Sequence, residues 1–148
     1  MDLSMNQPDV EWYNALPKTG AIYGLIDTAT FGMSKMERLR AVIALGESDD
    51  PRAVRPLMGI LRDGDPEIRI YATSALGTLK SGRAVDALIG RLKDKNEQSA
   101  TRQQAAAALA AIRSNTAILG LKECIADENE DPAIRSYIRG VLSRMGSW

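Results

Sequence analysis

The stretch that decides the fold is residues 66–94, which read PEIRIYATSALGTLKSGRAVDALIGRLKD. Its first half carries apolar side chains three and four residues apart and ends near Ala75-Leu76-Gly77. Its second half starts a new apolar series at Ala84-Val85, which continues through Leu88 and Leu92. This spacing is typical of amphipathic helices. The stretch therefore predicts two helices joined by a short turn at Ser81-Gly82.

The same pattern recurs along the chain at nearly constant spacing. The leucines that correspond to Leu76 lie 31, 33 and 33 residues apart, and an arginine precedes each by seven residues; the pairs are Arg38 and Leu45, Arg69 and Leu76, Arg102 and Leu109, and Arg135 and Leu142. A period in this range indicates stacked helical hairpins, because one hairpin cannot bury its own apolar face. The predicted fold is an all-α, right-handed α-α superhelix of about four hairpins with degenerate terminal caps.

Aspartate, proline and glycine residues indicate where helices are expected to begin and end. Asp50 and Pro51 would begin the second helix of the first hairpin, since proline at the first turn loses no hydrogen bond. Glycines near predicted helix ends are interpreted as caps, namely Gly46, Gly77, Gly82 and Gly146. The second helices, expected to form the inner layer, are predicted over 20–31, 51–62, 82–93 and 116–126.

The whole chain, 1–148, is predicted to be a single repeat domain. The expected units are a partial repeat at 19–35, three repeats at 36–65, 66–98 and 99–131, and a half repeat at 132–148. Residues 1–18, with Trp12 and Tyr13, are interpreted either as an irregular cap or as a mobile segment that docks elsewhere.

Composition excludes several classes of function. Nineteen basic and nineteen acidic residues cancel, so no global field attracts nucleic acid or an anionic membrane. No apolar stretch approaches the roughly 20 residues of a membrane span. The single cysteine, Cys124, cannot form an intramolecular disulfide, and no basic start precedes an apolar run. We expect a cytoplasmic protein.

The repeating residues resemble a known family. The run Pro66-Glu67-Ile68-Arg69 to Ala75-Leu76-Gly77, followed by Gly82-Arg83-Ala84-Val85 to Asp94, is similar to the HEAT-like repeats of the phycobilisome-lyase type. The resemblance covers residues 36–146 well and 8–31 weakly. It implies that the first helices form a convex layer and that the second helices line a concave, protein-binding groove. Similar repeats occur in bilin lyases, deoxyhypusine hydroxylase and helical DNA glycosylases.

The chemistry of those enzymes is mostly missing from the sequence. The chain has no histidine, so the His-Glu iron pairs of a deoxyhypusine-hydroxylase-like protein cannot form. Cys124 precedes the core position Ile125 and is interpreted as a small buried hydrophobe. No dinucleotide fingerprint or phosphate loop occurs. We therefore expect a non-enzymatic protein without a metal or a cofactor.

Two further series repeat with the same period. Arg38, Arg69, Arg102 and Arg135 occupy one position on the first helices, and Asp63, Asp94 and Asp127 follow the second helices. We interpret them as a structural ladder between repeats rather than a row of ligand-binding side chains.

The candidate binding residues lie on the second helices, where small side chains alternate with charged ones. Basic residues concentrate on the first two repeats, with acidic positions on both sides. The predicted partner-binding set is Tyr23, Asp27, Arg52, Arg55, Arg62, Arg83, Asp86, Lys93 and Glu123. An equally acceptable interpretation is that these arginines only solvate an exposed helix face.

Two classes of function remain. The first is a scaffold or adaptor that binds a protein or peptide through the concave face, which needs nothing beyond these features. The second is a lyase-like accessory factor or nucleic-acid binder that uses the basic middle of that face. Neutral net charge and few aromatic residues disfavour nucleic acid.

Overall fold

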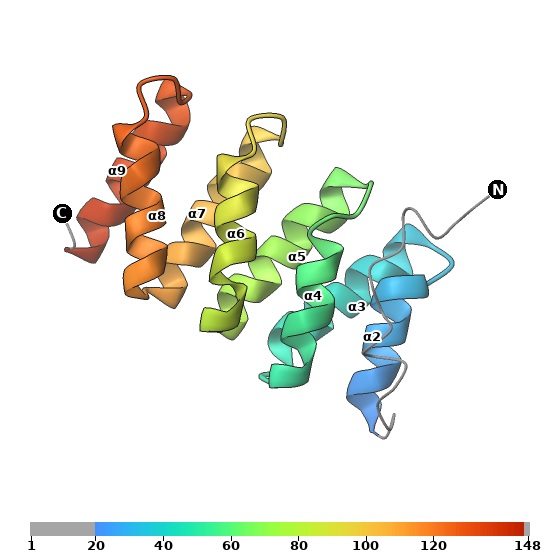
Figure 1. Cartoon of the computed structure of the whole chain (residues 1–148). Helices are drawn as coiled ribbons and strands as arrows, with labels where there is room; N and C mark the ends of the chain where they lie inside the picture. The colour runs from blue at the N-terminus through green and yellow to red at the C-terminus, as the bar shows by residue number, and fades with distance from the viewer. Residues whose placement is uncertain (1–19, 147–148) are drawn as a thin grey trace.

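The described part of the chain is helical from end to end. The computed structural model describes residues 20–146, and every regular element among them is a helix (Figure 1). The all-α solenoid is confirmed. The predicted cap at 1–18, with Trp12 and Tyr13, lies outside the described residues, as do residues 147–148. None of the described helices is long and apolar enough to cross a membrane.

The helices follow the predicted repeat closely. In chain order they are α2 (Ala21–Phe31), α3 (Lys35–Glu47), η2 (Pro51–Ala53), α4 (Val54–Ile60), α5 (Pro66–Leu79), η3 (Gly82–Ala84), α6 (Val85–Lys93), α7 (Ser99–Ile112), α8 (Asn115–Ala126) and α9 (Pro132–Met145). The short elements η2 and η3 are 3₁₀ turns that lead directly into α4 and α6. The second helices of the first two repeats therefore start with a tighter turn than an α-helix has.

Aspartate followed by proline begins a second helix at one place and first helices at two others. The Asp50 side chain accepts a hydrogen bond from the Arg52 amide, next to Pro51. Asp65 does the same before α5, and Asp131 before α9, each followed by proline. These carboxylates satisfy backbone donors that have no partner inside the helix.

The helices form two layers with the core between them. The first-helix layer consists of α3, α5, α7 and α9, and the second-helix layer of α2, α4, α6 and α8, which lies in front in Figure 1. The four repeat leucines, Leu45, Leu76, Leu109 and Leu142, are fully buried. Each repeat therefore buries its leucine with the help of neighbouring helices, as a solenoid requires.

Two of the predicted glycine caps are wrong. Gly46 and Gly77 lie inside α3 and α5 and are buried. A Cβ atom at Gly46 would stand 2.8 Å from the Ala75 Cβ atom, and one at Gly77 would stand 2.9 Å from the Ala108 Cβ atom. The two glycines are needed for close contact between helices, not for a turn. Of the predicted caps, Gly146 does take the left-handed conformation, with φ 68°.

The left-handed caps of α5 and α7 are not glycines. Lys80 ends α5 with φ 53°, and Arg113 ends α7 with φ 62°. Each donates its backbone N–H to a leucine carbonyl of its own helix, Leu76 or Leu109. These caps could not be predicted from the sequence, because glycine or asparagine is the usual residue in this conformation, not lysine or arginine.

The two layers differ in spacing. The first helices pack along one another, α3 on α5, α5 on α7 and α7 on α9, whereas α4 and α6 scarcely approach each other. The Gly-Ala contacts account for the close approach of the first helices. That the second helices line a concave groove stays a prediction.

The glycine contacts can be tested with a matched pair of substitutions. Gly77→Ala should lower the free energy of unfolding by about 1–3 kcal/mol, because the added methyl group overpacks a close helix contact. Gly90→Ala in α6 has nothing within 4 Å of the new Cβ atom. It should raise stability by about 0.5–1 kcal/mol through helix propensity alone. Urea unfolding measures both, and equal effects would contradict the close-contact interpretation.

Candidate interaction surface

A buried arginine joins the third repeat to the half repeat. Arg102 and Glu130 are each 4% exposed. The Arg102 Nε atom donates to the Leu92 carbonyl at 2.8 Å, and its Nη2 atom donates to the Glu130 carboxylate at 2.6 Å. The other Glu130 oxygen accepts the Asp131 amide at 2.8 Å. One guanidinium group thus ties the end of α6 to the loop that precedes α9.

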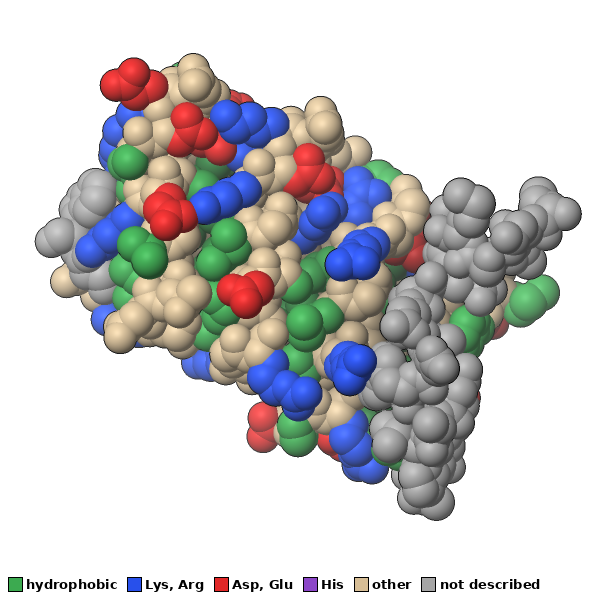
Figure 2. Space-filling view, viewed as in Figure 1, with side chains coloured by type: hydrophobic (Ala, Val, Ile, Leu, Met, Phe, Trp, Pro, Cys, Tyr) green, Lys and Arg blue, Asp and Glu red, His purple; other side chains and the backbone are tan. Residues whose placement is uncertain are grey.

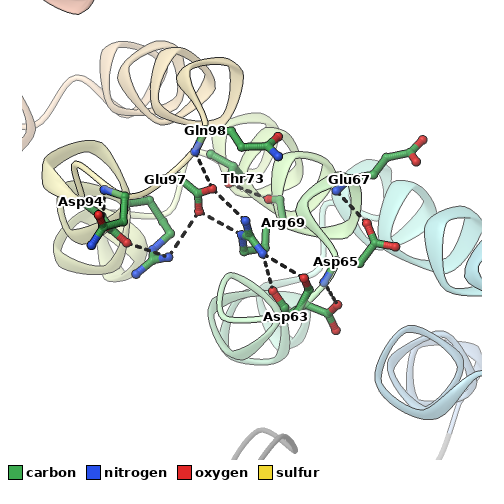
Figure 3. A network of polar contacts seen from close by, with 11 residues as sticks. Asp63, Asp65, Glu67, Arg69, Thr73, Asp94, Glu97 and Gln98 are labelled. Atoms are coloured by element: carbon green, nitrogen blue, oxygen red, sulfur yellow. Dashed lines mark hydrogen bonds and ion pairs between the residues drawn. The ribbon is translucent and has the colours of Figure 1, made fainter. Parts of the chain in front are cut away.

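The same connection recurs between the other repeats. Arg69 binds both oxygens of Glu97, each at 2.9 Å, and donates to the Asp63 carbonyl at 2.8 Å (Figure 3). Arg38 forms an ion pair with Asp63 and donates to the Ala29 carbonyl. The predicted arginine ladder is confirmed, since each guanidinium group has a carbonyl or a carboxylate within reach.

The carboxylates of the ladder are not all the predicted ones. Asp94 and Asp127 instead accept the backbone amides of Asn96 and Asn129, two residues further on. Glu97 and Glu130 take their place, and both stand in the loops that lengthen the later repeats. The sequence carried a signal for this exchange. The later repeats are two residues longer, and their longer loops contain the glutamates. In the shorter first loop, Asp63 performs both tasks.

The ladder lowers the pKa of its glutamates. Burial alone would raise the pKa of Glu97, but hydrogen bonds from Arg69 and the Gln98 amide outweigh it, so that the pKa lies below its usual value. At Glu130, burial is likewise outweighed by Arg102 and the Asp131 amide, and the pKa is lowered. Both carboxylates are therefore held in the charged form.

Part of the predicted binding set is a local cluster at the amino-terminal end of the second helices. The guanidinium carbon of Arg52 lies 5.3 Å from the centroid of the Tyr23 ring, within cation–π range. Its Nη2 atom is 2.7 Å from the Asp50 Oδ2 atom, and this hydrogen bond lowers the pKa of Asp50. Tyr23 is buried whereas Arg52 is exposed. The cluster holds Arg52 in one orientation on the surface.

The remaining predicted residues differ in how far they are paired. Lys93 forms an ion pair with Glu123 across the second and third repeats. Within residues 20–146, the side chains of Arg62, Arg83 and Asp86 are exposed and have no ion pair or hydrogen bond. Arg55 and Asp27 are exposed as well, although each has an interaction.

All of the predicted binding residues except the buried Tyr23 are exposed, and they lie on or next to the helices of the second-helix layer. Figure 2 shows basic side chains gathered over α4 and α6, with hydrophobic patches between them. The equivalent position of Arg55 on α8 is Leu119, which is 57% exposed. The side of the second-helix layer that faces away from the first helices, defined by the eight exposed residues of the predicted set, is called the basic outer face below.

The chain's single thiol, at Cys124, lies in the interior of the stack. Cys124 is buried, and burial raises the pKa of its thiol, which disfavours the nucleophilic thiolate. Among residues 20–146, no three acidic, histidine or cysteine side chains are placed to hold a metal ion.

Comparison with known proteins identifies the class. A family model described as HEAT repeats matches residues 24–100 and 59–143. The chain belongs to this family. Its structure is similar to that of human deoxyhypusine hydroxylase in complex with glycerol, with a TM-score of 0.75 and 21% identity. The match covers 94% of this chain and 53% of that chain, so this chain spans about half its length. At this identity the likeness shows the fold alone. No curated protein matches the sequence.

Breaking the buried pair should be far more costly than breaking an exposed one. Glu130→Ala leaves the Arg102 guanidinium buried with a carbonyl as its remaining partner, and should cost about 3–5 kcal/mol of stability. Glu123→Ala removes the partner of Lys93 on the surface and should cost less than about 1 kcal/mol. Chemical denaturation gives both values. Similar losses for the two variants would show that burial does not decide the strength of the ladder.

The ladder also predicts a dependence on pH. The pKa of Glu97 is lowered from 4.5 in the folded protein, so its contribution is complete above that value and disappears as the pH falls through the folded pKa. Stability should therefore decline below about pH 4.5, and more gently in Glu97→Gln, which has no charge to lose. Unfolding curves across this range test the point. If the free energy of unfolding fell equally steeply with pH in wild type and in Glu97→Gln, the prediction would be contradicted.

Proposed function

We propose that this HEAT-repeat chain is a non-enzymatic scaffold that binds a protein partner through its basic outer face. The observation that carries the proposal is the presence of Arg62 and Arg83, two exposed guanidinium groups without an ion pair among residues 20–146. On the same face, Arg52 and Lys93 are held by Asp50 and Glu123. Arginine is one of the residue types that are enriched at protein interfaces and at their hot spots.

The stack supports this role because its main ion pairs lie elsewhere. The carboxylates and guanidinium groups of the ladder face one another between repeats, whereas Arg62 and Arg83 have no ion pair among residues 20–146. Arg52 is already oriented by Asp50 and the Tyr23 ring. A side chain held in place loses less conformational entropy on binding than a mobile one does.

The charges on the face favour a partner with an acidic centre. Basic side chains lie over the first two repeats, with Asp27 before them and Glu123 after them. Complementary charge of this kind raises the rate of encounter and rejects wrongly charged partners. We further propose that the repeats are of the phycobilisome-lyase type and that the protein acts in the cytoplasm.

The second candidate is a lyase-like accessory factor or a nucleic-acid binder that uses the same arginines. It shares the basic surface, but the face offers few aromatic side chains for stacking with bases or rings. A salt titration with a fluorescent single-stranded oligonucleotide separates the two. If the chain is a protein-binding scaffold, we expect no oligonucleotide binding, or an affinity that does not change with salt. If it binds phosphates, its affinity for the oligonucleotide should fall steeply as the salt concentration rises.

Charge reversal tests the scaffold directly. Arg62→Glu with Arg83→Glu should weaken captured native partners at least about tenfold, a change on the order of 1.4 kcal/mol in binding. Folding stability should change little, because exposed charges contribute little to it. The control is Arg139→Glu with Arg144→Glu on α9, which makes the same change in charge on the other layer. Affinity capture with mass spectrometry compares the variants, and full retention of partners by the first variant would refute the basic outer face.

A further inference from the structure

The outward side of α3 carries a stripe of four exposed residues, Met36, Arg40, Ile43 and Glu47. They lie at helical spacing, so their side chains share one side of the helix. Met36 is 56% exposed and Ile43 is 40% exposed. The charged groups of Arg40 and Glu47 are exposed and have no ion pair or hydrogen bond among residues 20–146. The stripe is therefore apolar at its centre, with one unpaired charge of each sign beside it.

The neighbouring helix extends this surface. Tyr71 of α5 occupies the position equivalent to Arg40 one repeat later and is 39% exposed. Because α3 and α5 pack along one another, the ring of Tyr71 belongs to the same face as the stripe. Tyrosine, methionine and arginine are enriched at interfaces relative to the rest of a protein surface. This face belongs to the first-helix layer, away from the basic outer face.

The order of charges on the stripe is self-complementary. Arg40 and Glu47 are seven residues apart, about 10.5 Å along the helix, which is too far for them to pair with each other. Ile43 lies almost midway between them. A two-fold axis that is perpendicular to α3 and passes close to Ile43 places a second α3 antiparallel to the first. It brings each Arg40 opposite the Glu47 of the other copy and the two isoleucines together, as an isologous interface requires.

We propose that the α3 stripe, together with Tyr71, is an interface with a second copy of this chain. The two ion pairs set the antiparallel register, because a parallel arrangement of the two helices would place like charges opposite each other. Burial of Ile43, Met36 and Tyr71 supplies the apolar part of the contact. The dimer leaves both basic outer faces pointing outward, so it presents two partner-binding surfaces.

One helix and part of its neighbour form a small interface. Stable interfaces bury about 800 Å² on each partner, and a contact of two helices lies at the lower end of that class. We therefore expect a reversible dimer with a dissociation constant in the micromolar range, typical of modest interfaces. Sedimentation equilibrium of the full chain from about 1 to 200 μM spans that range.

Charge exchange provides a test with its own internal control. In the proposed dimer, position 40 of one copy faces position 47 of the other. Arg40→Glu would therefore place two glutamates opposite each other, and Glu47→Arg would place two arginines opposite each other. Each variant should be monomeric by itself. Mixed in equal amounts, the two should form a heterodimer, since every glutamate then meets an arginine. The double variant Arg40→Glu/Glu47→Arg should dimerise about as well as wild type. Ile43→Asp should raise the dissociation constant at least tenfold.

Circular dichroism melting confirms that each variant is folded, and Arg139→Glu serves as a reversal outside the stripe that should leave the dimer intact. Four results would overturn the proposal: a wild-type chain that stays monomeric at the highest concentration, single reversals that dimerise normally, an Ile43→Asp variant that dimerises as wild type does, or a mixture of single variants that remains monomeric. None of these outcomes depends on the native partner, so failure here is distinct from failure of the scaffold.

Discussion

The guanidinium–carboxylate contact between successive repeats is the interaction on which the rest of the structure depends. At Arg102 it is almost completely buried, and its carbonyl and carboxylate partners satisfy a charge that would otherwise be very costly. Because each arginine reaches from one hairpin to the loop of the next, the contact sets the distance and rotation between repeats. The leucines of the core can then pack in the same way in every repeat.

The second constraint is the close approach of the first helices. Gly46 and Gly77 let α3 and α5 meet alanines of the next helix with no side chain between the backbones. This draws the first-helix layer together, while α4 and α6 remain more widely spaced. The second-helix layer exposes charged side chains such as Arg62 and Arg83. The first-helix layer exposes Met36, Ile43 and Tyr71 instead.

The division of charge between interior and surface supports a binding role. Inside the stack, arginines and carboxylates satisfy one another and their geometry is determined by the fold. On the surface, Arg52 is oriented while Arg62 and Arg83 have no acidic neighbour among the described residues. A likeness to human deoxyhypusine hydroxylase shows that this stack of helices also occurs in an enzyme. A fold does not determine a function by itself, which has to be argued from the side chains on its faces.

The sequence by itself determined the helices, their order and the solenoid, because these depend on local signals. The Asp65 side chain, followed by Pro66, begins a helix by accepting the Glu67 amide only two residues further on. The period of Leu76 and Arg69 likewise needs no knowledge of distant residues. Tertiary structure decided which carboxylate each arginine binds, for which the longer period of the later repeats was only an indirect signal, and it decided why Gly77 is small. Glu97 replaced Asp94, and Gly77 proved to be a helix contact, because both outcomes depend on distances between repeats. Such distances result from packing in three dimensions, which residue spacing along one chain does not encode.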